Sequence, residues 1–202
     1  MPKKVDHEQR RRQIAAALLR IAATRGLHTA GLREVAAEAG VSVRLIQYYF
    51  GTKERLLQFS VEQLARQFGE RVRARATAAG LPPDPRTVID AILTVALPSD
   101  EESRLFNIVY TSYAALSLTD PAYDIQPLIR SSGAVEQVVS AQLSDAQKAG
   151  RMPAGLDPGA EATTLLALSA GLGTSVMLGQ RSTEDALGVL RYQLDRLLPA
   201  RA

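Results

Sequence analysis

The stretch LREVAAEAGVSVRLIQYY, residues 32–49, decides the fold. Its pattern predicts two short helices, residues 32–39 and 43–49, joined by the turn Gly40-Val41-Ser42. The turn needs a residue that tolerates a positive φ, which Gly40 supplies, and Ala36 is small enough for two steeply crossed helices to touch. Ser42 is well placed to cap the second helix. Such a helix-turn-helix presents its second helix to the major groove of DNA.

The apolar spacing around this stretch predicts an all-α chain. Between the two short helices, a small core closes through Val35, Ala39, Val41 and Ile46. No run alternates as a strand would, and residues 8–25 carry an apolar stripe at helical spacing that ends at Gly26. That stripe consists of Ile14, Ala17, Leu18, Ile21 and Ala22.

Six further helices are predicted downstream, which makes about nine in all. Thr52 caps a long helix that runs to residue 79, because the prolines of residues 80–85 cannot lie inside a helix. Pro127 either kinks the seventh helix or marks its true start. The remaining helices are expected over residues 86–97, 100–118, 121–149, 157–180 and 182–198.

Composition excludes several classes of protein. The 202 residues suffice for one domain or two small ones, and 46% hydrophobic with 22% charged residues is typical of a globular chain. There is no cysteine, which excludes disulfides, cysteine zinc sites and thiol nucleophiles, and the two histidines are His7 and His28. No apolar run approaches the roughly 20 residues of a membrane span, and no secretory signal is present. We therefore expect a soluble cytoplasmic protein with no cofactor, no metal and no membrane partner.

The positive charge is concentrated in the first quarter of the chain. Residues 1–55 hold eleven Lys or Arg against five Asp or Glu, a net charge of +6, whereas residues 56–202 hold thirteen against sixteen, a net charge of −3. A basic segment on a slightly acidic chain indicates contact with a polyanion, although an ordinary solvated basic surface has the same composition.

The segment GVSVRLIQYYFGTKERLL, residues 40–57, resembles the DNA-binding domain of the TetR family of bacterial transcriptional repressors. Tyr48, Tyr49 and Phe50 end the second helix, and Gly51-Thr52-Lys53 then lead into an acidic and hydrophobic helix start. The last 60 or so residues resemble the C-terminal domain of the choline–betaine regulator type. The resemblance implies a DNA-binding domain over residues 1–52 and a helical ligand-binding and dimerisation domain over residues 53–202.

The resemblance also implies which residues touch DNA. Val43, Arg44 and Gln47 begin the exposed side of the recognition helix, where Arg44 suits guanine O6 and N7 and Gln47 suits adenine. The predicted DNA-binding set is Arg33, Ser42, Val43, Arg44, Gln47, Tyr48, Tyr49 and Lys53, with phosphate contacts from the tyrosines and Lys53. Two alternatives stay open: Tyr49 packs partly in the core, and Arg33 forms a surface ion pair.

Some neighbouring residues receive other roles. Ile46 and Phe50 are expected in the core, and His28 in a packed or exposed turn. Gly31 stands where the family usually has a capping Thr or Ser, and Val43 and Leu45 are apolar where polar residues are frequent. The basic residues before the first stripe, which are Lys3, Lys4, Arg10, Arg11 and Arg12, are expected to be divided between solvated charge and phosphate contacts.

The last two predicted helices suggest a dimer. Residues 157–180 are apolar or small on nearly every face, which suggests that a second subunit covers the outer side. The expected interface is Leu165, Leu168, Leu172, Leu187, Leu190 and Leu194, and the alternative is that this stripe is intrachain core. Two recognition helices spaced about 34 Å apart, or a multiple, would read a palindrome.

The resemblance implies an unidentified small-molecule effector. The candidate ligand-binding residues are Phe106, Tyr110, Tyr113, Thr174 and Met177, and Phe59, Gln63 and Gln137 are further candidates for a cavity lining. Aromatic residues at this spacing are also typical of a core. The resulting prediction is a ligand-responsive repressor that binds operator DNA as a homodimer, with an enzyme or a helical protein-binding adaptor as alternatives. An enzyme is disfavoured because both histidines lie in or beside the DNA-binding segment.

Overall fold

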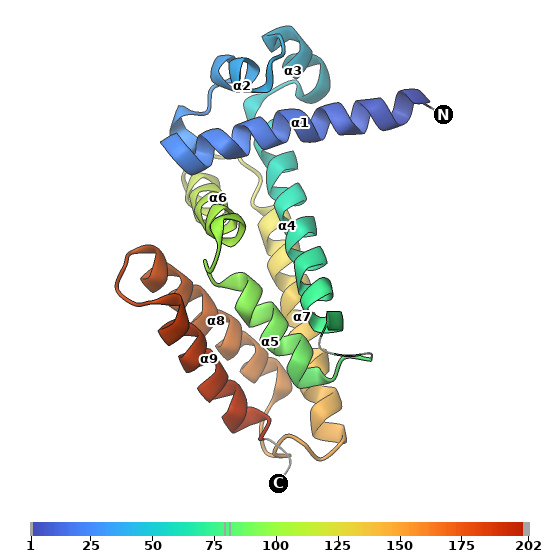
Figure 1. Ribbon diagram of the computed structural model, residues 1–202, viewed down its shortest axis with the longest axis vertical. Helices are drawn as coiled ribbons and strands as arrows, with labels where there is room; N and C mark the ends of the chain where they lie inside the picture. Colours follow the sequence, from blue (N-terminus) through green and yellow to red (C-terminus); the bar gives the residue numbers. More distant parts are fainter. Residues whose placement is uncertain (1, 79, 81, 200–202) are drawn as a thin grey trace. The chain divides into compact units, whose positions relative to one another are not determined.

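The chain is all-α, as predicted. The computed structural model describes residues 2–78, 80 and 82–199, and within these ranges it contains helices and turns but no strand (Figure 1). The helices are α1 (Pro2–Arg25), α2 (Leu32–Ala39), α3 (Val43–Phe50), α4 (Lys53–Ala78), α5 (Pro85–Ala96), α6 (Glu101–Thr119), α7 (Gln126–Lys148), α8 (Pro158–Met177) and α9 (Thr183–Leu197), with a short 3-10 helix at Leu27–Thr29.

Two predicted helix starts differ from the structure. The first helix begins at Pro2 instead of residue 8, and the seventh begins at Gln126 instead of residue 121. Pro127 therefore lies in the first turn of α7, where its missing N–H costs no intrahelical hydrogen bond. Before it, the carboxylates of Asp120 and Asp124 accept hydrogen bonds from the amides of residues 122 and 126, at 2.9 Å each. Residues 121–125 are therefore not helical as predicted, because these two aspartate side chains stabilise turns before α7 begins.

The chain divides into two compact units. The head unit comprises Met1–Arg66 and Ile108–Leu128, and the body unit comprises Gln67–Asn107 and Ile129–Ala202. In this division the first part of α4 belongs with the helix-turn-helix. Its side chains explain this placement, because Leu56 and Leu57 are fully buried and Phe59 is nearly so.

The head unit has an apolar core beneath α1, α2 and α3. All five residues of the predicted α1 stripe are at most 1% exposed, and Val35 and Ile46 are fully buried. Polar contacts add to this packing, since Arg20 forms a 2.7 Å ion pair with Glu38 and the Gln13 side chain donates to the carbonyl of Ala39 at 3.1 Å. Helix α1 thus holds α2 by both apolar and polar contacts.

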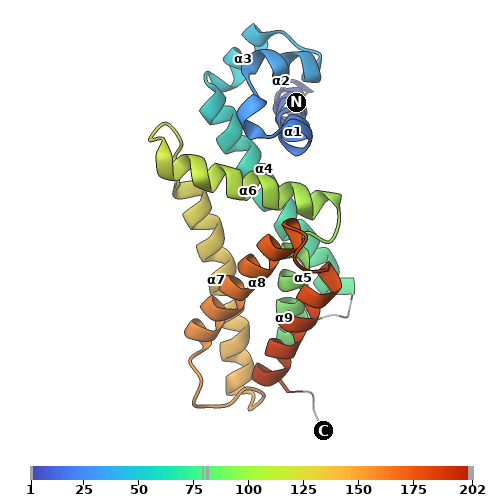
Figure 2. The same cartoon turned by 90° about the vertical axis from the view of Figure 1, so that its left-hand side faces the viewer.

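In the body unit, the core gathers leucines of α8 and α9 against α5. Helices α8 and α9 run side by side in Figure 2, and fully buried Leu165, Leu190 and Leu194 belong to the same cluster as Leu93 and Leu97. Aspartate and serine side chains cap these helices: Asp84 caps α5, Asp157 caps α8 and Ser182 caps α9. Hydrogen bonds from Thr87, its hydroxyl first, and from the amide of Arg86 hold the pKa of Asp84 below its ordinary value despite partial burial.

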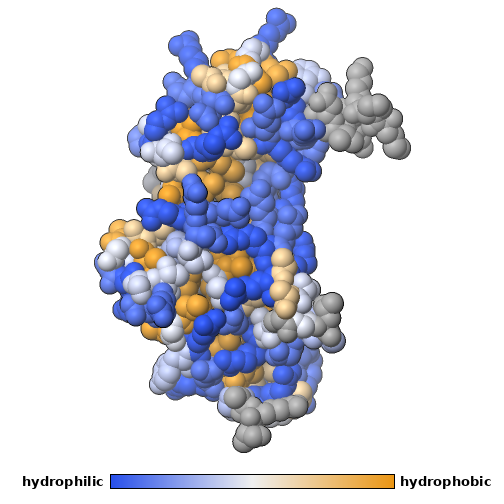
Figure 3. Space-filling model, in the orientation of Figure 1, coloured by the Kyte–Doolittle hydropathy of each residue, from blue (hydrophilic) through white to orange (hydrophobic). Residues whose placement is uncertain are grey.

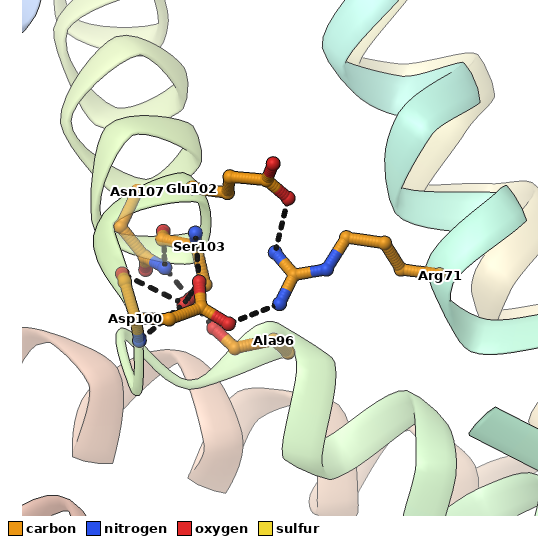
Figure 4. Close-up of polar contacts among 6 residues, drawn as sticks. All are labelled: Arg71, Ala96, Asp100, Glu102, Ser103 and Asn107. Atoms are coloured by element: carbon orange, nitrogen blue, oxygen red, sulfur yellow. Dashed lines mark hydrogen bonds and ion pairs between the residues drawn. The ribbon is translucent and has the colours of Figure 1, made fainter. Parts of the chain in front are cut away.

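A polar cluster fixes the start of α6 within the body unit (Figure 4). Asp100 caps the helix, because its carboxylate accepts from the amide of Ser103 at 2.8 Å while the Ser103 hydroxyl oxygen accepts from the amide of Asp100 at 3.1 Å. Arg71 of α4 pairs with Asp100 and lies 3.7 Å from the carboxylate of Glu102. Burial opposes ionisation of Asp100, but the hydrogen bonds from Ser103 and Arg71 outweigh it and lower its pKa.

The other side of this cluster requires a glycine in α8. The Asn107 amide donates to the carbonyls of Ala96 and Ser103 at 3.1 and 2.9 Å. A Cβ at Gly173 would lie 3.3 Å from the Asn107 side-chain oxygen, which is tighter than ordinary van der Waals contact. Glycine at this position therefore lets α8 approach the α5–α6 corner closely.

Among the described residues, no helix has the length and apolar character needed to cross a membrane.

Candidate nucleic-acid interface

The turn between α2 and α3 has the geometry that the sequence predicts. Gly40 is left-handed at φ 65° and ψ 36°, where an L side chain is rarely found. The amides of Gly40 and Val41 donate to the carbonyls of Ala37 and Ala36, at 3.3 and 3.0 Å, which satisfies the end of α2. The Ser42 hydroxyl then accepts from the amide of Leu45 at 3.1 Å and caps α3. The direction of α3 is thus set by hydrogen bonds at both ends of the turn.

Helix α3 has one buried face and one exposed face. Ile46 is fully buried and Phe50 is 5% exposed, as expected of core residues. On the opposite side, Arg44, Gln47 and Tyr48 are exposed, and their spacing of three and four residues places them on one face of the helix. Tyr48 is 72% exposed, which is unusual for an aromatic side chain. The exposed face therefore combines a guanidinium, an amide and a phenol.

The polar ends of this face have no partner within the described part of the chain. The side chains of Arg33, Arg44 and Gln47 take part in no hydrogen bond or salt bridge with a described residue. Arg33 therefore has no ion-pair partner among the described residues, which argues against the alternative of a surface ion pair. An unpaired guanidinium can bond guanine at two atoms, and an unpaired amide can do the same with adenine. The surface has the donors and acceptors that base-edge recognition requires.

The remaining predicted contacts lie around the edge of this face. Ser42 is exposed, and Val43, Tyr49 and Lys53 are half-buried. Tyr49 packs edge-on against His7 and Tyr48, with ring centroids 5.5 and 5.3 Å apart, so it is partly a packing residue. Lys53 is the first residue of α4, whose N-terminus is capped by the Thr52 hydroxyl at 3.3 Å from the amide of Arg55. A cationic side chain beside helix N–H groups suits a phosphate.

Arg11 has a contact that the sequence analysis missed. Its guanidinium carbon lies 4.2 Å from the ring centroid of Phe59 and 5.3 Å from that of Phe50, so it packs on aromatic rings. Helical spacing indicates this packing, because residue 11 lies three positions before Ile14 and seven before Leu18, on the buried face of α1. The side chains of Lys3 and Lys4, for which phosphate contacts were expected, lie outside the described residues.

Four of the six leucines predicted for a dimer interface lie in the core of their own chain. Leu165, Leu190 and Leu194 are fully buried within one chain and Leu172 nearly so, while Leu168 and Leu187 pack partly buried against the same core. The intrachain alternative therefore applies to the four buried leucines, because a side chain covered by its own chain has little surface to offer a partner. For Leu168 and Leu187 the interface stays a prediction. The outer face of α8 and α9 instead carries Ala167, Gly171, Leu178, Val189 and Tyr192, all exposed.

Three of the residues predicted to line a cavity have contacts within their own part of the chain. The buried Tyr113 hydroxyl donates to the carbonyl of Asp124 at 2.8 Å, so it holds the α6–α7 turn. Burial first, and then the charges of Asp124 and Glu62, raise the pKa of Tyr113 to about 12. Thr174 is exposed on the outer face of α8 with its hydroxyl bonded to the carbonyl of Ala170 at 3.1 Å. Phe59 belongs to the head core.

The other ligand candidates are divided between the units. Tyr110 is half-buried in the head unit, whereas Phe106 and Met177 are half-buried in the body unit. Phe106 stacks on Phe68 with centroids 5.4 Å apart and an interplanar angle of 23°. Of the additional choices, Gln137 is exposed, and the side-chain nitrogen of half-buried Gln63 has no hydrogen-bond partner among the described residues.

Comparison with known families matches both parts of the chain. The model described as bacterial regulatory proteins, tetR family, matches residues 14–58, and the model described as BetI-type transcriptional repressor, C-terminal, matches residues 85–199. The regulator PksA of Bacillus subtilis is 34% identical over 116 residues, which cover 56% of each chain. The regulator BetI 1 of Chromohalobacter salexigens is 32% identical over 130 residues, 64% of this chain and 62% of that protein. The matched region thus spans about three-fifths of these relatives.

Solved structures share the whole architecture. A transcriptional regulator from Rhodococcus sp. Rha1 is 26% identical with a TM-score of 0.78, over 93% of this chain and 95% of that one. A putative transcriptional regulator from Saccharomonospora viridis, solved in complex with choline, has a TM-score of 0.85 at 23% identity, over 96% of this chain and 100% of that one. At that identity, the second likeness establishes the fold alone.

Proposed function

Since the chain belongs to the TetR family of bacterial regulatory proteins, a family of DNA-binding transcriptional regulators and not of enzymes, we propose that it is a ligand-responsive repressor that binds a palindromic operator as a homodimer. The observation that carries this proposal is the outward face of α3. Arg44 and Gln47 are exposed there on a helix whose inner face is closed by Ile46 and Phe50. Such a regulator acts in the cytoplasm on double-stranded DNA.

The residues proposed to contact DNA fall into two groups, those that contact bases and those that contact phosphates. Arg44 reads guanine and Gln47 reads adenine, because each can form two hydrogen bonds with its base edge. Val43 contacts a thymine methyl. Arg33, Ser42, Tyr48, Tyr49 and Lys53 bond phosphates, which fixes the register of the helix but carries no sequence information.

The dimer is proposed to form through the outer face of α8 and α9. Ala167 and Gly171 allow a partner helix to approach closely, and Leu178 and Tyr192 are 67% and 65% exposed in the single chain. Figure 3 shows apolar patches interrupting the hydrophilic surface over these helices. Helices α8 and α9 from both subunits would form a four-helix interface, and two α3 helices would then enter successive major grooves about 34 Å apart.

A small molecule is proposed to release the dimer from its operator. The support is the match of residues 85–199 to the BetI-type domain, together with a structural neighbour that is a choline complex. Phe106 and Met177 of the body unit remain the candidates for ligand contact, and an aromatic ring suits a cationic or planar ligand. If the ligand favours a dimer whose heads do not fit the operator, DNA and ligand weaken each other's binding by the same factor.

A gel-shift titration against genomic fragments tests the repressor proposal. Binding should be selective for some fragments and should fall steeply as salt rises, because phosphate contacts release counterions. Thermal shift with choline and with lipophilic cations then tests the effector, and a compound that raises the melting temperature should also weaken the gel shift. Indifference to every double-stranded fragment would overturn the proposal, whereas selective binding with no effector response would overturn its ligand half.

A further inference from the structure

One arginine of the head unit is packed where a DNA contact was expected. The Arg11 guanidinium lies over the rings of Phe59 and Phe50, and these two rings are themselves 5.4 Å apart. Phe50 is the last residue of α3, and Phe59 lies two turns into α4. One planar cation on α1 therefore contacts the end of the recognition helix and the helix that follows it.

The surroundings of Arg11 differ from those of the two adjacent arginines. Its Nε atom is buried without a hydrogen-bond partner among the described residues, and its Nη1 atom lies 3.7 Å from the carboxylate of Glu8. The side chain is 36% exposed, against 67% for the adjacent Arg12. Arg10 differs again, since its guanidinium donates to the Gln13 side chain at 2.8 Å. Arg12 also pairs with the Glu8 carboxylate, 3.5 Å from its Nε atom, so the stacking on Phe50 and Phe59 is what distinguishes Arg11 from its neighbours.

Neighbouring residues of α1 hold the same motif at other points. His7, one turn before Arg11, packs edge-on against Tyr49. Gln13 donates to the carbonyl of Ala39, the last residue of α2. Helix α1 therefore touches the end of α2 and the end of α3, on either side of the turn that sets the direction of the recognition helix.

We propose that Arg11 is a positioning residue for operator recognition, which fixes the C-terminal end of α3 through its stacking on Phe50 and Phe59 and does not bind a phosphate. The inference rests on the proposed DNA-binding function. It lies outside the matched part of the DNA-binding family model, which begins at residue 14. Arg is suited to this place because its flat guanidinium can stack on both rings, whereas Lys offers only a compact point charge.

Salt dependence separates the two possible roles of Arg11. Each phosphate contact contributes about −0.9 to the slope of log affinity against log salt concentration. Loss of a phosphate contact therefore makes this slope shallower in addition to weakening binding. Loss of a positioning contact misplaces Arg44 and Gln47, which weakens operator binding and leaves the slope unchanged.

The test compares Arg11→Met with Arg12→Met in the full-length chain. We expect Arg11→Met to weaken operator binding by about 3- to 30-fold, in line with a desolvated cation–π contact, with no change in salt slope and little change in binding to random DNA. Arg11→Lys should restore the charge but not the affinity. Arg12→Met removes the same charge from an exposed position, and it should show no energetic coupling to Phe59.

A double-mutant cycle keeps the test independent of folding. Thermal unfolding is recorded for every variant, and Arg11→Met is combined with Phe59→Leu. Operator affinities should be non-additive for this pair, because each change removes the same contact. A shallower salt slope for Arg11→Met, full rescue by Arg11→Lys, or additive affinities would overturn the inference. Failure of the unmodified protein to bind any operator would overturn the proposed function instead.

Discussion

The exposed face of α3 and the exposed face of α8 and α9 differ in chemistry. On α3, Arg44 and Gln47 extend polar groups that no described residue satisfies. On α8 and α9, small and apolar residues such as Gly171 and Tyr192 are exposed, alongside charged residues such as Asp185 and Arg196. An unsatisfied polar group matches a partner with complementary donors and acceptors, whereas an apolar surface matches any partner that excludes water from it. The first face is thus suited to specific recognition and the second to association.

The largest expected effect comes from placing a charge on the α8 face. A Cβ at Gly171 would meet no atom within 4 Å, so Gly171→Glu should fold as a single chain. In a dimer, the two carboxylates would lie near the symmetry axis and repel each other. We expect a monomer in sedimentation velocity and a loss of operator affinity of at least about 100-fold, since one recognition helix offers few base contacts.

The matched control is Gly69→Glu on α4. This glycine is equally open, because a Cβ there would also meet no atom within 4 Å. The Gly69→Glu variant should leave both the oligomeric state and operator binding unchanged. A dimeric Gly171→Glu chain with normal operator affinity would remove this face from the proposed interface.

A change on the inner side of the same helices should affect stability instead. Leu190 is fully buried in the body core, so Leu190→Ala should lower the free energy of unfolding by about 2–5 kcal/mol through lost burial and a cavity. Urea unfolding measures this value, with the exposed Val138→Ala on α7 as the control for stability. A loss below about 1 kcal/mol would mean that Leu190 is not a core residue.

On the α3 face, Arg44→Ala should change binding without changing stability. Loss of one bidentate base contact costs about 1–3 kcal/mol, and each of the two half-sites would lose one. The melting temperature should stay the same, because the Arg44 side chain has no partner among the described residues. Gel shifts on a selected operator measure the effect, with the exposed Arg130→Ala on α7 as the charge-matched control. Equal affinities for both variants would take Arg44 out of the recognition surface.

The smallest effect concerns alkaline pH and the turn at the end of α6. The pKa of Tyr113 is raised to about 12 in the folded chain, above its ordinary value of 10.0, chiefly by burial. The stabilising contribution of the neutral phenol is therefore complete below pH 10 and is lost as the pH rises through about 12. Tyr113→Phe should be less stable by about 1 kcal/mol at pH 8, because it loses the hydrogen bond to the carbonyl of Asp124.

The pH dependence of the difference in unfolding free energy is the readout for Tyr113. The advantage of the unmodified chain over Tyr113→Phe should be constant from pH 8 to 10 and shrink above that range. A difference that does not change with pH would show that this phenol is not shielded from water.

The parts of the site that were predictable depend on local chemistry. A positive φ at Gly40 and a cap at Ser42 follow from the residue type and its immediate neighbours, and both were confirmed. The burial of Ile46 and the exposure of Arg44 follow from helical spacing within a motif of known orientation. These features need no knowledge of distant parts of the chain.

The parts that were not predictable depend on contacts between segments far apart in the sequence. A helical stripe of leucines has the same sequence pattern whether its own chain or a partner covers it. The sequence therefore does not distinguish an interface from a core at Leu190, which the structure places in the core of its own chain. Tyr113 was chosen for a ligand because the turn that brings the Asp124 carbonyl to its hydroxyl could not be foreseen. Arg11 was grouped with its charged neighbours, although its aromatic partners lie 39 and 48 positions later.

Selection of random double-stranded DNA by the purified chain, followed by measurement of the mass of the complex, tests the central proposal most directly. We expect enrichment of a two-fold symmetric sequence whose half-sites are centred about one helical turn apart, or a multiple, with two chains or a multiple of two on each site. Enrichment of an asymmetric sequence held by one chain, or no enrichment at all, would contradict it.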